Sequence, residues 1–189
     1  MKRTVLTAAV VMLALVALTA GSVSAQAVTD EQKGERSRME RKIRSKILSL
    51  PYYGVFDAIG YELNGTTVTL NGYVTRPFTK ENATDEVMEV SGVTNVINNI
   101  EVLPPSPSDD RIRVRIYRNI ANHGNMYRYL LGANPSIRIV VNRGRVILEG
   151  IVTYESDKTL AYAAASEVFG VFGVTNNLRL ERREGEEVS

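Results

Sequence analysis

The densest set of chemically active side chains in this sequence is a run of arginines in its second half. Between positions 111 and 145 there are eight arginines and no acidic residue. Such a local excess of positive charge predicts an anionic partner. The alternative is that these arginines pair with acidic residues of the first half or of the glutamate-rich end of the chain, because exposed charges commonly pair without a function. The eight are Arg111, Arg113, Arg115, Arg118, Arg128, Arg138, Arg143 and Arg145.

Beside the arginines lies the segment MYRYLL, residues 126–131. Tyrosine rings and leucines suit a membrane interface, where an arginine meets phosphate. Near an anionic surface each arginine contributes about 1 kcal/mol, so binding would weaken as salt is added. The alternative is that Tyr127, Leu130 and Leu131 cover the core beneath them. The residues predicted to contact anionic phospholipid headgroups are Arg111, Arg115, Arg118, Arg128, Tyr127, Tyr129 and Leu130.

Residues suited to enzyme chemistry are scarce. There is no cysteine, so the chain has neither a thiolate nucleophile nor a disulfide. His123 is the single histidine, which excludes a histidine-based metal cluster or proton relay. No glycine-rich phosphate loop is present. The sequence therefore predicts no catalytic residue, no cofactor and no metal site.

The first 25 residues have the layout of a secretory signal peptide. Lys2 and Arg3 precede an apolar run, and small residues follow up to a predicted cleavage site near Ala25. A permanent anchor is the alternative, but the apolar run from Thr4 to Ala20 is shorter than the roughly 20 residues that span a bilayer. Without Lys2 and Arg3 the chain has 21 basic and 21 acidic residues, so its charge acts through distribution. Export also argues against nucleic acid as the anionic partner.

The chain contains an internal repeat. When the sequence is shifted by 78 residues, positions 64–102 align with 142–180 without a gap, and 15 of the 39 pairs are identical. Such a repeat indicates two copies of one domain. We predict a first domain at 39–103 and a second at 111–182. They are joined by a proline-rich linker at 104–110 and flanked by an extension at 26–38 and a charged tail at 183–189. Phe169 and Phe172 replace Ser91 and Thr94 of the first copy, and either pack between the copies or lie exposed.

Both copies predict the same α+β architecture. In the first, Met39, Ile43 and Ile47 recur at helical spacing before Pro51, and a β-hairpin turns at 64–65. A second helix begins at Pro77, and a third strand follows. Each unit is thus α-β-β-α-β, with two helices on one face of a small mixed sheet. In the second copy, residues 111–120 alternate like a strand but also space isoleucines four apart, and analogy with the first copy favours a helix. The second helix of that copy is predicted to begin at Ser156 as its N-cap.

Four glycines recur in both copies and are predicted to be structural. Gly72 and Gly150 lie inside strands, where glycine weakens the strand unless another segment approaches closely. We predict that the second helix of each copy crosses there. Gly92 and Gly170 lie where that helix ends.

These segments resemble the BON domain, the module of bacterial osmotically inducible periplasmic proteins and nodulation-associated proteins. The resemblance rests on NGTTVTLNGYV and NRGRVILEGIV, on the lysine and alanine of the helix that follows, and on the Gly-Val-x-x-Val-x-Asn run. It implies an α-β-β-α-β fold, a cell-envelope location, phospholipid binding and protection during osmotic stress. It brings no catalytic residues.

The resulting hypothesis is a non-enzymatic periplasmic protein that maintains the envelope and touches the membrane peripherally through its second copy. One alternative is a protein-interaction module of the envelope, whose binding would survive raised salt and depend on apolar residues. Another is a pair of domains that senses a small ion, detectable as a cation-dependent rise in melting temperature. The sequence leaves the oligomeric state open.

Overall fold

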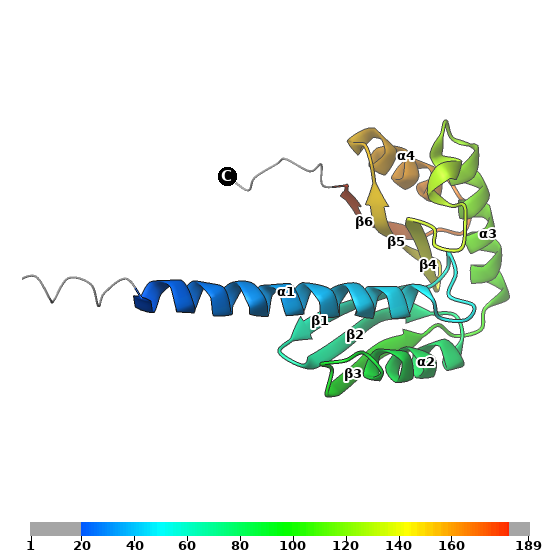
Figure 1. Ribbon diagram of the computed structural model, residues 1–189. Helices are drawn as coiled ribbons and strands as arrows, with labels where there is room; N and C mark the ends of the chain where they lie inside the picture. The colour runs from blue at the N-terminus through cyan, green and yellow to red at the C-terminus, as the bar shows by residue number, and fades with distance from the viewer. Residues whose placement is uncertain (1–19, 182–189) are drawn as a thin grey trace, which may run out of the picture. The chain divides into compact units, whose positions relative to one another are not determined.

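The computed structural model describes residues 20–181, which form the elements labelled in Figure 1. The predicted signal peptide falls largely outside this range, as does the predicted tail at 183–189. No described helix is both long and apolar enough to cross a membrane. The elements are α1 (Ala20–Leu48), β1 (Ala58–Asn64), β2 (Thr67–Val74), α2 (Pro77–Met88), β3 (Asn95–Val102), α3 (Pro107–Asn122), the 3-10 turn η1 (Met126–Tyr129), β4 (Ile137–Asn142), β5 (Arg145–Val152), α4 (Glu155–Ser166) and β6 (Gly173–Leu180).

The chain divides into two compact units, residues 1–41 and 42–189, with the boundary inside α1. In the first unit, Arg36 and Glu40 of α1 form an exposed ion pair at 3.0 Å. The second unit contains the last turns of α1, which bury Ile43 and Ile47, and both sequence repeats.

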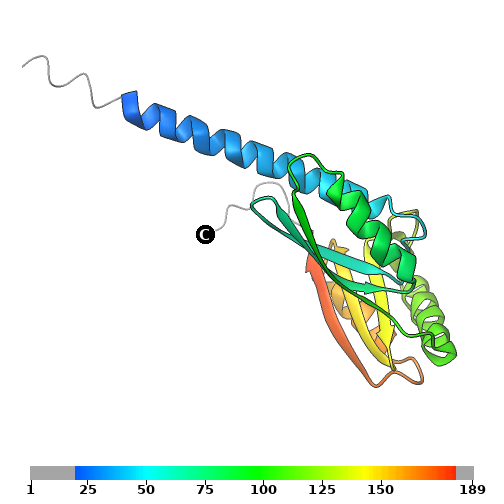
Figure 2. The same ribbon diagram turned by 90° about the horizontal axis from the view of Figure 1, so that it is seen from below.

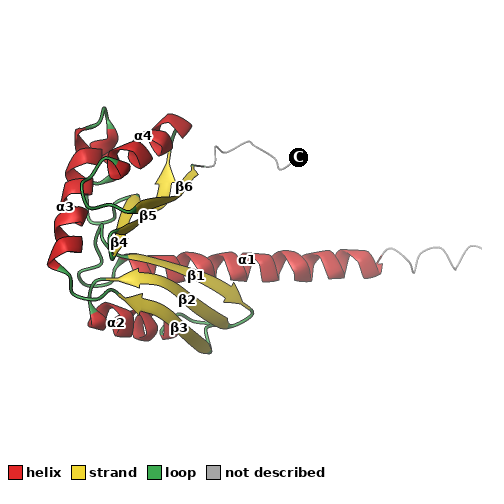
Figure 3. Cartoon of the chain, turned by 180° about the vertical axis from the view of Figure 1, so that it is seen from behind, coloured by secondary structure: helices red, strands yellow, loops and turns green. Residues whose placement is uncertain are grey.

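Each repeat builds a three-stranded mixed sheet with the same topology. The strand order is β1-β2-β3 in the first and β4-β5-β6 in the second. The first pair of strands is antiparallel and the second pair parallel, so α2 and α4 are the crossover helices that a parallel pair requires (Figure 3). The predicted α+β architecture of two α-β-β-α-β repeats is confirmed.

The helices of each repeat cover one face of its sheet, as Figure 2 shows for α2 on the first sheet. In β2, Val68, Leu70 and Val74 alternate into the core beneath the helices, and polar residues alternate outward. In the second repeat, Ala161 and Ala164 of α4 are fully buried. Their small side chains let the helix lie close to the sheet.

The two strand glycines are structural, but the predicted cause is wrong. Gly72 has φ +130°, and a Cβ atom there would lie 2.0 Å from the carbonyl oxygen of Ala58. Gly150 has φ +128°, and its Cβ would lie 1.9 Å from the carbonyl oxygen of Ser136. The approaching segment is therefore the backbone of the neighbouring strand, not a crossing helix. Gly92 and Gly170, which share φ +96°, occupy the turns after α2 and α4.

Residues 107–122 form the helix α3, which confirms the choice of helix over strand, but α3 starts earlier than predicted. Ser106 is its N-cap, and its hydroxyl accepts a hydrogen bond from the backbone N–H of Asp109 at 3.2 Å. The linker is accordingly shorter than the predicted 104–110. Helix α4 begins at Glu155 with Tyr154 as N-cap, so the N-cap prediction for Ser156 is also wrong.

Candidate functional site

Two of the eight arginines are buried and hold the fold together. Arg113 is 4% exposed, and its guanidinium donates hydrogen bonds to the Asp110 carboxylate and, at 2.6 Å, to the carbonyl of Val141. It thereby joins α3 to β4. This arginine cannot reach an external partner.

Arg138 is the second buried arginine, and it joins the two repeats. Its guanidinium donates to the carbonyl of Gly54 at 2.7 Å and lies 4.3 Å from the ring centroid of Tyr53, both in the first repeat. Burial lowers the pKa of Arg138 below its usual range. The N–H of the next residue, Ile139, donates to the carbonyl of Val55 at 2.7 Å. Because these contacts link residues far apart in sequence, Arg138 is a structural residue.

Arg128 is paired within its own repeat. Its guanidinium donates to the carboxylate of Asp157 at 2.8 Å and to the hydroxyl of Tyr129 at 2.8 Å, and it stacks 4.6 Å from that ring's centroid. The pKa of Arg128 is raised above its usual value, chiefly by the hydrogen bond to Tyr129. Part of the arginine run therefore does pair with acid, but with acidic residues of the second repeat.

The predicted lipid contact at Tyr129 and Leu130 is wrong, because both side chains are buried, at 6% and 4% exposure. The Tyr129 hydroxyl donates to the Asp157 carboxylate at 2.5 Å and accepts from the N–H of Thr153 at 2.9 Å. The MYRYLL loop therefore covers the core, which was the alternative interpretation. Tyr127 and Leu131 remain 50% and 56% exposed.

Three predicted contact residues are on the surface. Arg111, Arg115 and Arg118 are exposed, and their spacing places them on one side of α3. Within residues 20–181 none of the three forms an ion pair. We call this set the α3 arginine row. It is the part of the predicted lipid site that the fold brings together.

Two further exposed arginines, Arg143 and Arg145, were not singled out as contact residues. Arg143 lies in the β4–β5 turn, with φ +51°, and is followed by Gly144, with φ +73°; Arg145 is the first residue of β5. Two consecutive positive φ angles define a type I′ hairpin turn, which arginine rarely enters. The segment Asn142-Arg-Gly-Arg145 between two apolar strands is the sequence pattern that could have placed both arginines at a hairpin turn.

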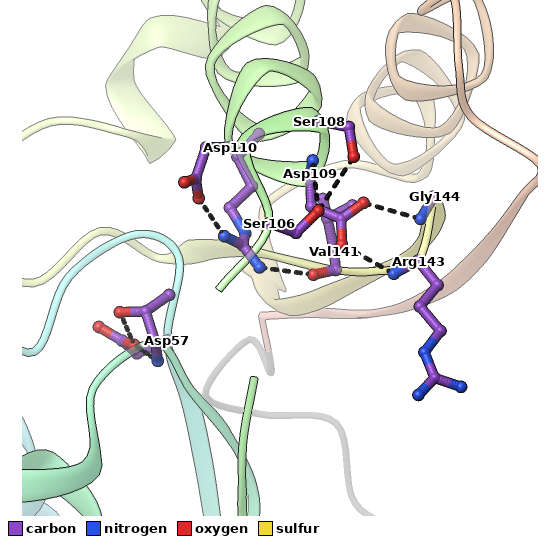
Figure 4. Close-up of polar contacts among 10 residues, drawn as sticks. Asp57, Ser106, Ser108, Asp109, Asp110, Val141, Arg143 and Gly144 are labelled. Atoms are coloured by element: carbon purple, nitrogen blue, oxygen red, sulfur yellow. Dashed lines mark hydrogen bonds and ion pairs between the residues drawn. The ribbon is translucent and has the colours of Figure 1, made fainter. Parts of the chain in front are cut away.

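A buried carboxylate holds this turn in place. Asp109, 3% exposed in the first turn of α3, accepts hydrogen bonds from the backbone N–H groups of Arg143 and Gly144, both at 2.9 Å. The N-terminus of α3 also stabilises the negative charge. Figure 4 shows the Arg143 side chain extending away from these contacts. The arrangement fixes a strained turn that presents a cation outward.

Other candidate features offer less chemistry. The Nδ1 atom of His123 lies 2.6 Å from the carbonyl of Asn119 at the end of α3, so this histidine caps the helix. The described residues contain no group of three or more histidine, cysteine or acidic side chains placed to hold a metal. A cleft of about 640 Å³ between the repeats has mixed charge, since Arg44, Arg179, Glu62 and Glu149 all line it.

No curated protein matches the chain. Among solved structures, the C-terminal domain of CdsD, the structural protein of the type III secretion system of Chlamydia trachomatis, is 11% identical, with 75% of this chain and 96% of that one covered and a TM-score of 0.31. A second CdsD structure is also 11% identical, with coverages of 78% and 94% and a TM-score of 0.28. TM-scores this low do not bear on the function of this chain.

The family comparison is specific. The model of the BON domain matches twice, at residues 37–104 and 108–182, and the two matches coincide with the two α-β-β-α-β repeats. Together they cover most of the sequence, so this chain belongs to the BON domain family as a tandem pair.

Proposed function

We propose that this chain is a non-enzymatic protein of the bacterial periplasm that helps maintain the envelope during osmotic stress and binds anionic phospholipid through its second repeat. BON domains occur in envelope and periplasmic proteins and are generally non-catalytic. The leader-like N-terminus supports export. The membrane contact is peripheral.

The observation that carries the proposal is the α3 arginine row. Arg111 and Arg118 are separated by about 10 Å along the helix, at about 1.5 Å per residue. The row therefore lines up three cations on one stretch of surface with no carboxylate paired to them among the described residues. At about 1 kcal/mol per arginine near an anionic leaflet, the row supplies about 3 kcal/mol. This is enough for reversible, salt-sensitive binding.

The corresponding helix of the first repeat is mixed in sign, because Glu40 lies beside its exposed basic residues Arg41, Lys42 and Arg44. Lys46, near the end of α1, is neutralised by Glu86 at 2.6 Å and Glu89 at 2.7 Å. These bonds raise the pKa of Lys46, with the hydrogen bond to Glu86 as the largest cause. This difference supports the second repeat as the one that contacts lipid.

Co-flotation with liposomes tests the proposal. The mature chain, from Gln26, is mixed with vesicles of phosphatidylglycerol and phosphatidylcholine or of phosphatidylcholine alone, at low and at high salt. We expect flotation with the anionic vesicles at low salt and its loss in the Arg111→Glu/Arg115→Glu/Arg118→Glu variant. A matched control, Arg38→Glu/Arg41→Glu/Lys42→Glu, has the same net charge and should still float. Equal loss in both variants, or no flotation of the unchanged chain, would overturn the proposal.

One observation favours a second candidate function, the docking of an envelope protein on the first repeat. Tyr52 is 71% exposed and has φ +61°, an unusual backbone conformation for tyrosine. Its ring contacts Phe78 edge-on at 5.5 Å, and the Arg76 guanidinium lies 4.7 Å from its centroid. Exposed aromatic and arginine side chains of this kind are enriched at protein interfaces. Crosslinking in the envelope that depends on Tyr52 and persists in high salt would support this candidate.

A further inference from the structure

We propose that Phe169 and Phe172, together with Arg143 and Arg145, form a membrane anchor in which the two rings enter the interfacial layer of an anionic bilayer. We call this set the aromatic tip. The inference rests on the proposed function, because it concerns the same lipid surface. It adds a second, apolar contact at a place that the α3 arginine row does not include.

The two phenylalanines are the most exposed large apolar side chains of the described residues, at 89% and 81%. They do not pack between the repeats. Their neighbours in the same loop, Val168 and Val171, turn inward and pack on the core of the second repeat. The loop is thus anchored by its valines and presents its phenylalanines to the outside. A single exposed apolar residue is ordinary, but two large rings presented by one short loop mark an interaction surface.

The backbone holds Phe172 next to the turn that carries the arginines. The N–H of Phe172 donates to the carbonyl of Gly144 at 2.9 Å. The ring lies over that glycine so closely that a Cβ atom at position 144 would be 2.7 Å from the ring's Cδ2 atom. Arg143 adjoins Gly144 in the turn that Asp109 holds, and Arg145 pairs in register with Gly173, the residue after Phe172. The backbone positions of both arginines therefore lie next to that of Phe172.

This combination fits a lipid surface. Aromatic rings enter the boundary between headgroups and acyl chains, and neighbouring arginines bind the phosphates above them. The described part of the chain has no acidic residue paired with Arg143 or Arg145, so both charges are available. Charge complementarity therefore favours an anionic bilayer over an uncharged apolar partner.

The first repeat shows that the fold does not need these rings. There the N–H of Thr94 donates to the carbonyl of Thr66 at 2.9 Å, which is the same backbone bond. The two threonine hydroxyls share a hydrogen bond at 2.7 Å, and the position equivalent to Phe169 is Ser91. The same loop thus exists in a polar form. Phe169→Ser/Phe172→Thr accordingly gives each position the residue that the first repeat has there.

A tryptophan reporter tests insertion directly. Because the chain has no tryptophan, Phe172→Trp gives a single tryptophan at the tip, whose emission is separated from that of the tyrosines by selective excitation. With vesicles that contain phosphatidylglycerol we expect emission to move to shorter wavelength and to be quenched by lipids brominated near the top of their acyl chains. Flotation without either change would overturn the anchor while leaving the α3 arginine row in place. Absence of flotation would overturn both.

The strength of the anchor is measured with matched double variants. Phe169→Ser/Phe172→Thr should weaken binding to anionic vesicles by about tenfold or more, given the transfer free energy of aromatic side chains. Tyr52→Ser/Phe78→Thr removes two exposed aromatic side chains of the first repeat and should leave the affinity within about threefold. An equal loss in both variants, or a blue shift of Phe172→Trp that requires an envelope protein instead of lipid, would contradict the proposal.

Discussion

The two repeats share a backbone and differ in what their ends present. In both, an asparagine of the last strand, Asn98 or Asn176, donates to a helix carbonyl, that of Lys80 at 2.8 Å or of Lys158 at 2.9 Å. The tips differ, with threonine hydroxyls in one and phenylalanines with arginines in the other. Duplication has kept the contacts that determine the fold, while the exposed side chains have diverged.

The same requirement is sometimes met by different residues. The N–H of Thr75 donates to the Asp57 carboxylate at 2.6 Å, whereas the equivalent N–H of Thr153 donates to the Tyr129 hydroxyl. The backbone group needs an acceptor in both repeats, because a buried N–H without one is costly. The comparison shows that a recurring contact can be kept while the residue that makes it changes.

The largest effect should come from breaking what the repeats share. Gly72→Ala and Gly150→Ala each place a methyl group against a backbone carbonyl at a φ near +130°, so each should destabilise the chain by about 3 kcal/mol or more. Urea unfolding measures the loss. A mild effect at either position would show that the two sheets are not equivalent there.

A smaller effect is expected from the buried carboxylates that hold the turns. Asp109→Asn leaves one acceptor oxygen for the two N–H groups of Arg143 and Gly144, and should cost about 2 kcal/mol. Asp57→Asn in the first repeat should cost a similar amount, because Asp57 accepts from Thr75 and Gly54. Only Asp109→Asn should also weaken vesicle binding, since only its turn presents Arg143. Flotation and urea unfolding of both variants test this contrast.

The two buried tyrosines should differ by a modest amount. Tyr129→Phe removes a hydroxyl that bridges Thr153 and Asp157, and should cost about 2 kcal/mol. Tyr53→Phe removes one acceptor, for the N–H of Ile59 at 3.0 Å, and should cost about 1 kcal/mol. Thermal unfolding of the two variants side by side measures the difference. The reverse order would contradict a cost set by the number of hydrogen bonds that each hydroxyl makes.

The smallest effect on stability is expected at the aromatic tip. Phe169→Ser/Phe172→Thr should change the free energy of unfolding by less than about 0.5 kcal/mol, because both rings are exposed. Calorimetry of the double variant checks this. A large destabilisation would mean that the rings support the fold of the second repeat instead of a partner.

The repeat, the order of elements and the helical nature of α3 could be read from the sequence, because apolar periodicity and the 78-residue identity are local or pairwise patterns. The aromatic tip could be predicted in part, since Phe169 and Phe172 replace Ser91 and Thr94 of the first repeat. The reason why position 72 requires glycine could not be predicted, because both a helix and a strand can approach a glycine closely. The start of α3 was missed because the proline-rich linker concealed a Ser106 N-cap.

By itself the sequence determined that this protein is a duplicated α-β-β-α-β chain with its positive charge concentrated in the second copy. Only the tertiary structure decided which arginines are available. Arg138 donates a hydrogen bond to a carbonyl 84 residues away. Arg113 donates to Val141, 28 residues away, and Arg128 donates to Asp157, 29 residues away. Exposure depends on such distant partners, which no local pattern specifies. Charge can therefore be counted along the chain, but its accessibility is set by the fold.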